Sequence, residues 1–579
     1  MIKNIFYLLG RRSFFGGLLI LLGSLILIFL ELVSLGSIPL FLGFYIDPNN
    51  LLAKFPLLER FLNINFFDIS NESIFLGIIL FSIFLIKNLY SLLYIFFNEL
   101  YFAELKRKIS SDLLKKYLNL DINFFKENNS SLLNRNIIFE SRVAVSYINF
   151  FIKFIKDLLL SFTILIVLII INPIPTIIIV IFFSIFIIFY YFIIKNVLLK
   201  NSKGLTDIRG LHFKNLSQIF NSIKLINLRQ NQEFFYDKFN KFNETEKKLT
   251  LISGFIPKVP RYIFEIIAVF ALIFVLIFLT EFQNKTIVEN LPILTFYVLS
   301  FIRVVPLFNS ISECLSYLRS TSYQFNYIVN QSKISSSLDK KEISHFQSNH
   351  DDDNKILNFQ NLEVKDLFFN YSSKKFIFEN VNLKIQKNKN ICIMGKTGSG
   401  KSTFMDVIMG FQKPKKGQIL INKINLENVL PSWKKKIGYI PQDIYLNDTT
   451  IAENIAFGVD KDKIDLKQLN RVIELAQLKI FVDSLQNKAF SMVGEKGSKL
   501  SGGQIQRIGI ARALYFKPEI LILDEATNAL DEETERNIMQ EIDKLKKTYT
   551  IITITHKKEV AEFCDEIYLI EGLKIVKKN

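Results

Sequence analysis

The sequence predicts two parts of different fold class: an α-helical part that crosses a membrane six times, and an α/β part with a largely parallel sheet. Three observations support this prediction. Hydrophobic residues make up 50% of the chain, the mean hydropathy is +0.27, and there are 57 Phe but 1 Trp, a composition typical of membrane proteins. Long apolar runs lie before residue 330, and short strand-like runs alternate with helical patterns after residue 356. At 579 residues the chain has room for both parts.

The first apolar run, Phe14 to Ile46, is interrupted by a single acidic residue, Glu31. As one helix it would be longer than a hydrocarbon core of about 30 Å, so we expect it to protrude, tilt or kink near Pro39. Five further runs are expected to span the membrane: Ile74 to Phe97, Val145 to Ile171, Thr176 to Val197, Tyr262 to Leu279, and Ile293 to Leu307.

The connections between these runs alternate in charge. Those between the second and third runs and between the fourth and fifth are rich in Lys and Arg, whereas residues 172–175 and 280–290 carry little charge. The positive-inside rule therefore predicts that both chain ends are cytoplasmic. The same rule accounts for the net charge of +17, and no nucleic-acid partner is expected. A short amphipathic stretch, Leu57 to Phe67, is expected either on the outer membrane surface or in an ordered loop.

The composition predicts three consecutive regions. Residues 1–330 form the transmembrane domain, the polar residues 331–355 a solvated linker, and residues 356–579 the α/β domain. The three cysteines lie far apart without metal-ligand spacing, so we expect ordinary buried thiols. Strands of the α/β domain are predicted at Asn390 to Met394, Ile437 to Pro441, Ile520 to Leu523, and Tyr549 to Thr555.

The stretch CIMGKTGSGKSTF, Cys392 to Phe404, has the spacing of a phosphate-binding loop. An apolar strand precedes it and a helix from Ser402 to Met409 is predicted to follow, so the positive end of the helix faces the anion. Lys401 is expected to meet the terminal phosphates of a nucleotide, and Ser402 to reach Mg²⁺. The nucleotide-binding loop comprises Gly395, Lys396, Thr397, Gly398, Ser399, Gly400, Lys401, Ser402 and Thr403.

A second apolar strand, in ILILDE, ends at two carboxylates. Hydrolysis of a phosphoanhydride needs one carboxylate to organise Mg²⁺ and another to orient and polarise water. Asp524 suits the first role and Glu525 the second. In LSGGQIQR, Ser501 and two glycines stand just before a helix and predict a second anion-binding helix start, which we expect to serve a partner's nucleotide.

These motifs together resemble the nucleotide-binding domain of ABC transporters, whose signature is LSGGQ. The resemblance implies that Tyr371 stacks on the adenine of ATP, that Gln442 is the Q-loop glutamine that touches Mg²⁺, and that His556 is the switch histidine near the γ-phosphate. It also implies a D-loop aspartate, Asp531, and catalysis of ATP hydrolysis by Glu525, His556 and Gln442. The signature consists of Leu500, Ser501, Gly502, Gly503 and Gln504.

Six spans fused to one such domain are similar to half-size ABC exporters. This implies a homodimer in which each ATP lies between the Lys401 loop of one subunit and the Ser501 loop of the other. Segments near Asn123 to Asn136 and Phe220 to Phe234 match coupling helices in position. A soluble ABC ATPase of DNA repair or translation would share the motifs, but the six spans exclude that class.

Three cationic residues lie in or beside apolar runs: Lys87, Arg261 and Arg303. Because charges are costly in hydrocarbon, they are candidate contacts for an anionic substrate. Alternatively, Lys87 pairs with Glu31, Arg261 snorkels, and Arg303 meets a carboxylate such as Glu265.

The membrane features resemble bacterial lipid-linked oligosaccharide flippases. This implies an inner-membrane protein that moves a polyprenyl-pyrophosphate glycan between leaflets. Lipid A-type lipids, drugs and peptides remain alternatives in the same architecture. A channel or regulator that does not pump is a further alternative, against which the intact Glu525 and His556 argue.

Overall fold

The structure is a computed structural model that describes residues 2–46, 69–278, 291–333, 358–371, 375–525 and 532–578. It divides into two compact units, Met1–Lys340 and Lys341–Asn579. The segment Leu57 to Phe67, residues 280–290 and Asp531 lie outside the described residues. Of the expected linker, only residues 331–333 are described, as the end of a helix over residues 322–333. The predicted domain limits at residues 330 and 356 therefore stay predictions.

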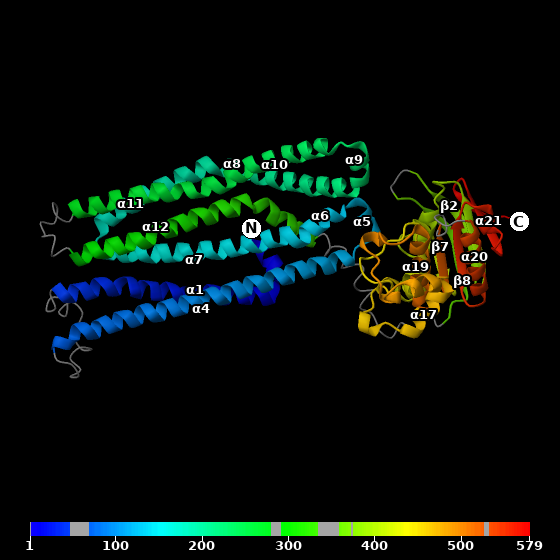
Figure 1. Ribbon diagram of the computed structural model, residues 1–579. Coiled ribbons are helices and arrows are strands. Elements are labelled where there is room, and N and C mark those ends of the chain that lie inside the picture. The colour runs from blue at the N-terminus through cyan, green and yellow to red at the C-terminus, as the bar shows by residue number, and fades with distance from the viewer. Residues whose placement is uncertain are drawn as a thin grey trace. The chain divides into compact units, whose positions relative to one another are not determined.

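The first unit consists of long helices that run side by side (Figure 1). They are α1 (Ile2–Ile46), α4 (Ile69–Leu118), α7 (Ser141–Ile171), α8 (Pro173–Asn221), α10 (Gln232–Phe255), α11 (Val259–Ile277) and α12 (Leu291–Ser320). The two prolines after Asn172 explain the sharp start of α8, because proline lacks the N–H that the first helical turn leaves unpaired.

Among the described residues, 5 helical segments are long and apolar enough to cross a membrane: Lys3–Phe44, Ile74–Leu118, Ser130–Ile171, Gln232–Ile277 and Ile293–Ser320. The other expected span, Thr176 to Val197, lies in α8, where several side chains are not described. Many apolar side chains on these helices are exposed in the single chain, as lipid-facing residues are. The predicted helical membrane fold is confirmed.

Helix α1 is interrupted near its start. The backbone leaves helical geometry at Gly10 (φ 61, ψ 170), which precedes the first apolar run, and Pro39 lies inside the helix. Glycine adopts this left-handed φ at little cost because it has no Cβ. Lys108 Nζ of α4 bridges the break by donating to Leu9 O at 3.2 Å and to Ser13 Oγ at 2.9 Å.

Short helices lie in the two segments that match coupling helices in position, near Asn123 to Asn136 and near Phe220 to Phe234. They are α5 (Ile122–Glu127), α6 (Ser130–Arg135) and α9 (Ile223–Arg229). A π-helical turn, Asn136–Glu140, joins α6 to α7, and the buried pair of Arg135 Nε and Glu140 Oε1 lies across it at 3.3 Å.

The second unit contains a 6-stranded sheet in the order β10-β9-β3-β8-β7-β6. Every neighbouring pair from β9 to β6 is parallel, and β10 is antiparallel to β9. The four strands predicted from apolar runs are present, and the predicted α/β class is confirmed. The strands are β3 (Asn390–Gly395), β6 (Ile437–Ile440), β7 (Ile520–Asp524), β8 (Thr550–Thr555), β9 (Glu566–Glu571) and β10 (Lys574–Lys578).

A second, antiparallel sheet was not predicted. It has 4 strands in the order β2-β1-β4-β5: β1 (Asn361–Phe369), β2 (Phe378–Gln386), β4 (Lys416–Ile421) and β5 (Ile424–Asn425). In the second half of β2, buried Val381, Leu383 and Ile385 alternate with exposed residues. Such strands bury one face only, so they lack the continuous apolar run that identified the parallel strands.

The core beneath the phosphate loop holds Trp433 of α15 (Leu430–Lys435), the chain's 1 Trp. Its side chain is buried, and Nε1 donates to Ile408 O at 2.9 Å. Ile408 is the last residue of α14 (Lys401–Ile408), the helix that starts at the phosphate loop. The three cysteines are free thiols; Cys314 and Cys392 are buried as expected, whereas Cys564 is only partly buried.

Candidate functional site

The phosphate loop connects β3 to α14, as the spacing predicted. Gly398 and Gly400 have φ of 82 and 98, values that side chains rarely tolerate, and a Cβ at Gly400 would lie 2.9 Å from Ile377 and Phe378. Lys401 Nζ donates to Gly395 O at 2.9 Å and to Lys396 O at 3.2 Å. The loop therefore curls over its own lysine at the N-terminal end of a helix, the geometry that binds phosphate.

The residues of the loop fit an anionic ligand. Ser399 Oγ is buried and has no hydrogen-bond partner among the described residues, although a hydroxyl ordinarily finds one. Thr397 and Gly398 are exposed, and a Cβ at Gly398 would meet nothing within 4 Å. An oxygen-rich ligand on this side could accept from Ser399 and from the loop's N–H groups.

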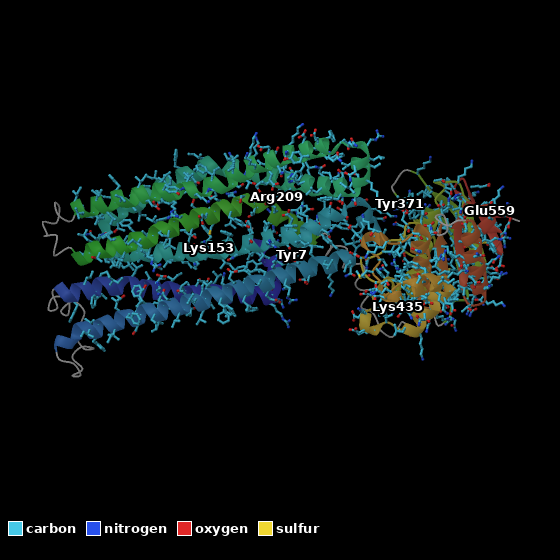
Figure 2. All side chains as sticks on the ribbon, viewed as in Figure 1. Tyr7, Lys153, Arg209, Tyr371, Lys435 and Glu559 are labelled. Carbon is cyan, nitrogen blue, oxygen red and sulfur yellow. The ribbon has the colours of Figure 1, made fainter. Side chains whose placement is uncertain are left out.

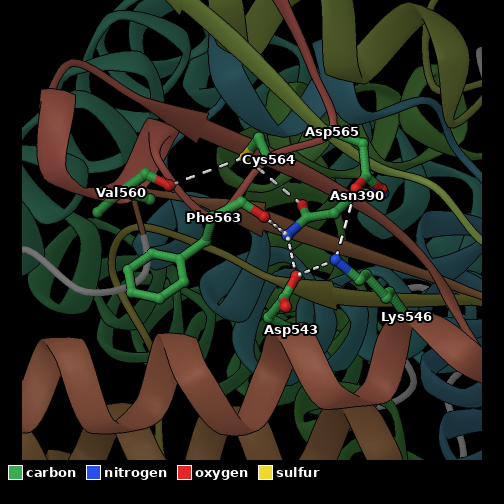
Figure 3. Close-up of polar contacts among 7 residues, drawn as sticks. All are labelled: Asn390, Asp543, Lys546, Val560, Phe563, Cys564 and Asp565. Carbon is green, nitrogen blue, oxygen red and sulfur yellow. Dashed lines mark hydrogen bonds and ion pairs between the residues drawn. The ribbon is translucent and has the colours of Figure 1, made fainter.

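Polar contacts anchor the opposite end of β3 (Figure 3). Asn390 is fully buried, and its Nδ2 donates to Phe563 O at 2.9 Å, while its backbone N–H donates to Asp565 Oδ2 at 2.9 Å. Cys564 Sγ lies 3.6 Å from Asn390 Oδ1. Since Asn390 is the first residue of β3, this cluster fixes the strand that delivers the phosphate loop.

Asp524 ends β7 close to the start of α14, where its Oδ1 lies 3.5 Å from Ser402 Oγ. Its Oδ2 accepts a hydrogen bond from Tyr439 Oη at 3.3 Å. Burial raises the pKa of Asp524, and the two hydroxyl contacts oppose that rise by favouring the charged form. Burial also raises the pKa of Tyr439, with the charge of Asp524 as a further cause. The phenol therefore stays a donor to Asp524.

Glu525 stands between two basic groups. Its Oε1 lies 3.8 Å from Lys401 Nζ and 3.5 Å from His556 Nδ1, so the structure brings three predicted site residues together. Glu525 has φ of 48, an uncommon conformation for a residue with a side chain. Such local strain is often found at functional sites, where the surrounding structure holds it.

Two other predicted ATP-site residues are at least partly exposed, and one of them contacts the phosphate loop. Tyr371 (Figure 2) is 49% exposed and donates from Oη to Thr403 Oγ1 at 3.1 Å, which leaves an aromatic face beside the loop. Gln442 is exposed in the segment that follows β6.

The signature residues form a helix cap rather than a contact with the loop of the same chain. Ser501 caps α19 (Gly502–Tyr515): its Oγ accepts from Gln504 N at 3.3 Å, and Gln504 Oε1 accepts from Ser501 N at 2.9 Å. Ser501 and Gly502 are exposed. This reciprocal capping box presents the helix start to solvent.

The donor set suits Mg²⁺, a hard cation that prefers oxygen ligands and usually keeps water and substrate phosphates. Ser402 and Asp524 would hold the ion, with Gln442 from the following segment. When bound, it would neutralise charge on the phosphates.

The three cations named as candidate substrate contacts each lie beside a carboxylate. Glu31 of α1 lies 3.5 Å from Lys87 Nζ of α4 through Oε1, and 3.4 Å from Arg303 Nη2 of α12 through Oε2. Arg261 Nε donates to Glu265 Oε1 at 3.1 Å, and both side chains are at least half exposed. Lys87 thus pairs as the alternative interpretation expected, whereas Arg303 pairs with Glu31 and not with Glu265.

Sequence reasoning missed two polar residues, Tyr439 beside Asp524 and Asp157 between two helices of the helical unit. Tyr439 carried no signal beyond its place in a strand before Gln442. Asp157 of α7 is 2% exposed and accepts from Ser310 Oγ of α12 at 2.5 Å, with Lys156 Nζ at 3.4 Å from its other oxygen. Lys153, one turn earlier, is labelled in Figure 2. The signal for Asp157 was a lone acid within an apolar run.

Two family descriptions match the chain. The ABC transporter transmembrane region matches residues 14–305, and the ABC transporter domain matches residues 378–528. An ATP-dependent lipid A-core flippase of Pasteurella multocida is 36% identical over 220 residues, which are 38% of this chain and 38% of that protein. ABC transporter B family member 21 of Arabidopsis thaliana is 37% identical over 221 residues, 38% of this chain and 17% of that protein. The alignments thus span well under half of either relative.

The fold is similar to that of a bacterial Atm1-family ABC exporter solved with ATP bound. The TM-score is 0.76 at 16% sequence identity, and the superposition covers 98% of this chain and 94% of that one. At this identity the similarity concerns the fold alone.

Proposed function

Since the chain belongs to the ABC transporter family, a family of multi-pass membrane proteins, we propose that it is one half of an ATP-driven exporter. It would move a lipid-linked oligosaccharide, a polyprenyl-pyrophosphate glycan, from the cytoplasmic to the outer leaflet of a bacterial inner membrane. Both chain ends would be cytoplasmic. The observation that carries the ATPase part is the convergence of Lys401, His556 and Glu525 within 4 Å at one sheet edge.

In the proposed reaction, Lys401 and the N–H groups of the phosphate loop hold the phosphates, and Tyr371 stacks on adenine. Glu525 orients the attacking water and accepts its proton, while His556 contacts the γ-phosphate. Lys401 must then turn from the carbonyls of Gly395 and Lys396 towards the phosphates, exchanging neutral acceptors for charged ones.

We propose a homodimer because Ser501 and Gly502 of the signature are exposed, and the Ser501 side chain is engaged in the cap of its own helix. The exposed helix start would complete the ATP site of the partner subunit. Ser501→Arg in one subunit and Lys401→Ala in the other would place both defects in one composite site and leave the second site intact. We expect the mixture to regain about a quarter to a half of wild-type ATPase activity in mixed dimers if one intact site turns over alone. Activity equal to the average of the two variants measured separately would contradict a shared site.

The substrate proposal rests on positive charge in the helical unit. Lys87 and Arg303 share the single carboxylate of Glu31, so this cluster has two cations for one anion. A pyrophosphate that leaves water loses solvation, and basic side chains lining a wet cavity can replace part of it. The lipid tail would meanwhile stay in the bilayer.

A lipid A-type substrate is the second candidate. The name of the Pasteurella multocida relative favours it, since that protein is a lipid A-core flippase. Both lipids carry phosphate, so the charge argument supports either.

Reconstitution in liposomes tests the proposal. Purified protein is supplied with ATP and either a fluorescent polyprenyl-pyrophosphate glycan or fluorescent lipid A, and arrival in the opposite leaflet is measured by quenching. We expect ATP-dependent flipping of the glycan that Glu525→Gln abolishes. If lipid A is flipped and the glycan is not, the substrate is a lipid A-type lipid rather than a lipid-linked oligosaccharide. An ATP-independent ion current without flipping would support a channel.

A further inference from the structure

The charge cluster of the helical unit contains a residue to which no role has been given, Glu31. It joins three helices, because one oxygen faces Lys87 of α4 and the other faces Arg303 of α12. Counted from the nearest described ends of α1, α4 and α12, the three residues lie roughly 18 to 27 Å along their helices at about 1.5 Å per residue. The cluster therefore lies far from the described ends of these helices.

These ion pairs are incomplete. Charge-assisted hydrogen bonds between nitrogen and carboxylate are usually about 2.7–2.9 Å long, whereas the two pairs here measure 3.5 and 3.4 Å. Glu31 Oε2 is buried and accepts no hydrogen bond from the described residues. A carboxylate that binds its cations tightly would form short hydrogen bonds through both oxygens. An anion that forms such bonds with Lys87 and Arg303 could therefore bind them more strongly than Glu31 does.

The two cations differ in exposure. Lys87 is 4% exposed and its Nζ lies 5.4 Å from the ring centroid of Phe84, so its charge is shielded from solvent. The Arg303 side chain is 43% exposed. An incoming anion would reach the guanidinium first, and its planar fork suits phosphate.

We infer that Glu31 is an internal stand-in for the substrate's phosphate, a specificity-determining residue that neutralises Lys87 and Arg303 when no lipid is bound and yields them to a phosphate-bearing headgroup. The inference rests on the proposed transport of such a lipid. Without Glu31, two cations would remain uncompensated in an apolar bundle, which is costly. Once the lipid headgroup has crossed the membrane, the Glu31 carboxylate competes with its phosphate for Lys87 and Arg303. This competition favours release of the lipid.

Glu31→Gln tests this role because it keeps the shape and removes the charge. Binding is measured in nanodiscs with three probes: undecaprenyl pyrophosphate, lipid A, and undecaprenol, which has no phosphate. We expect the dissociation constant for the phosphate-bearing substrate lipid to fall about tenfold, the size of one charge-assisted contact, and that for undecaprenol to stay unchanged. Translocation should nevertheless slow, because release loses its competitor. Tighter binding with slower transport is a combination that a purely structural role would not produce.

Glu246→Gln is the matched control. Glu246 also holds two basic side chains, Arg209 Nε at 3.1 Å and His212 Nδ1 at 3.0 Å, but on α8 and α10 and away from Glu31 (Arg209 is labelled in Figure 2). This variant should bind all three lipids as the wild type does. Glu31→Asp, which keeps the charge, should stay within about twofold of the wild type.

The outcomes separate the inference from the substrate proposal. If only lipid A binds more tightly to Glu31→Gln, the stand-in role holds and the glycan proposal fails. If neither phosphate lipid binds more tightly, the stand-in role is wrong, even where wild-type glycan transport is found. Should Glu31→Gln not fold, Lys87→Met is compared with Lys87→Met/Glu31→Gln: the double variant frees Arg303 and must bind the phosphate lipid more tightly than the single one, and equal affinities overturn the role.

Discussion

The two units contain the same local arrangement in different surroundings: one glutamate between two basic side chains. In the α/β unit, Glu525 lies 3.8 Å from Lys401 and 3.5 Å from His556, at the end of a sheet. In the helical unit, Glu31 lies 3.5 Å from Lys87 and 3.4 Å from Arg303, between three helices. The first is built on loops whose backbone fixes each side chain. The second depends on the packing of long helices, so a shift of one helix changes it.

This difference assigns distinct tasks to the two clusters. A glutamate fixed at a strand end can orient water reproducibly, as catalysis requires. A glutamate shared between helices can instead change partners when the helices move. The predictions below test whether the two clusters are independent in this way.

The largest expected effect is that of Glu525→Gln. Loss of the general base should slow ATP hydrolysis at least about a hundredfold, because a positioned base typically contributes 10²–10⁴. ATP binding, measured by equilibrium dialysis, should persist, whereas the control Lys401→Ala should weaken binding itself. Near-normal turnover of Glu525→Gln would remove this residue from catalysis.

Neutralising the cations of the helical unit should affect transport alone. The triple variant Lys87→Gln/Arg261→Gln/Arg303→Gln is expected to lower glycolipid flipping about tenfold, because the phosphate loses charged partners. Basal ATPase activity and yield should remain largely intact, since Lys401 and Glu525 are untouched. Flipping and melting temperature are measured on the same samples.

Two results would contradict that expectation. Full flipping by the triple variant would exclude the anion path. A fall in yield and melting temperature together with activity would favour a structural role, because Glu31 and Glu265 lose their partners. Arg261→Gln alone is the control for surface charge, since its pair is exposed and should contribute little to stability.

The nucleotide site was largely predictable because its chemistry is encoded in short contiguous stretches. The phosphate loop, the Asp524–Glu525 pair and His556 each follow an apolar strand, and parallel strands bring their carboxyl ends to one edge. Spacing along the chain therefore translates into proximity in space. The roles of these residues in ATP hydrolysis stay predictions.

Tyr439 could not be found in this way. Its contact with Asp524 depends on the register of β6 against β7, in which Tyr439 pairs with Ile522. Register is a property of two strands and is not visible in either one. The same holds for Asn390, whose partners lie more than 150 residues away.

The helical unit was predictable in its spans and not in its contacts. Hydropathy located the membrane helices, but the partner of Arg303 depends on how α1 and α12 pack. The break of α1 at Gly10 precedes the apolar run and was not predicted, while Pro39 lies inside the helix. A proline can stay inside a long helix when neighbours satisfy the freed carbonyl, whereas Gly10 adopts a left-handed φ at little cost.

Tyr439→Phe should have a moderate effect and tests whether the Tyr439 hydroxyl positions Asp524 for Mg²⁺. Removing the hydroxyl frees Asp524 to rotate, so the Mg²⁺ concentration for half-maximal ATPase activity should rise about threefold to fivefold, as for one weak hydrogen bond. The matched control is Tyr445→Phe, because Tyr445 is 64% exposed in the following segment. An unchanged Mg²⁺ requirement would show that the 3.3 Å contact does not position Asp524.

The smallest expected effect concerns a helix cap with no part in the site. Thr450 caps α16 (Ile451–Ile455) by accepting from Glu453 N, and Thr450 Oγ1 donates to Glu453 Oε2 at 2.6 Å. Thr450→Ala should cost about 1 kcal/mol of stability in denaturant unfolding. The Thr450 hydroxyl and the Thr450 N–H both donate to the Glu453 carboxylate and lower its pKa, so they stabilise the fold above the ordinary glutamate pKa, and this stability is lost as the pH falls through the lowered value.

Glu453→Gln checks the sign of this pH dependence. The amide keeps the reach of the side chain but does not titrate, so its stability curve should be flatter in acid than that of the wild type. A wild-type curve that is equally flat would mean that the cap contributes no pH-dependent stability.

Trp433 gives the chain an intrinsic optical reporter at the C-terminal end of α14, the helix that starts at the phosphate loop. It is the chain's 1 indole, and it is hydrogen-bonded to the last residue of α14, the helix whose first residue is Lys401. Its fluorescence therefore originates from one known place, 1% exposed, among 21 tyrosines that emit at shorter wavelength. Any displacement of α14 that accompanies nucleotide binding can be followed in real time on the unlabelled protein, in detergent or in a bilayer, without introducing a reporter group.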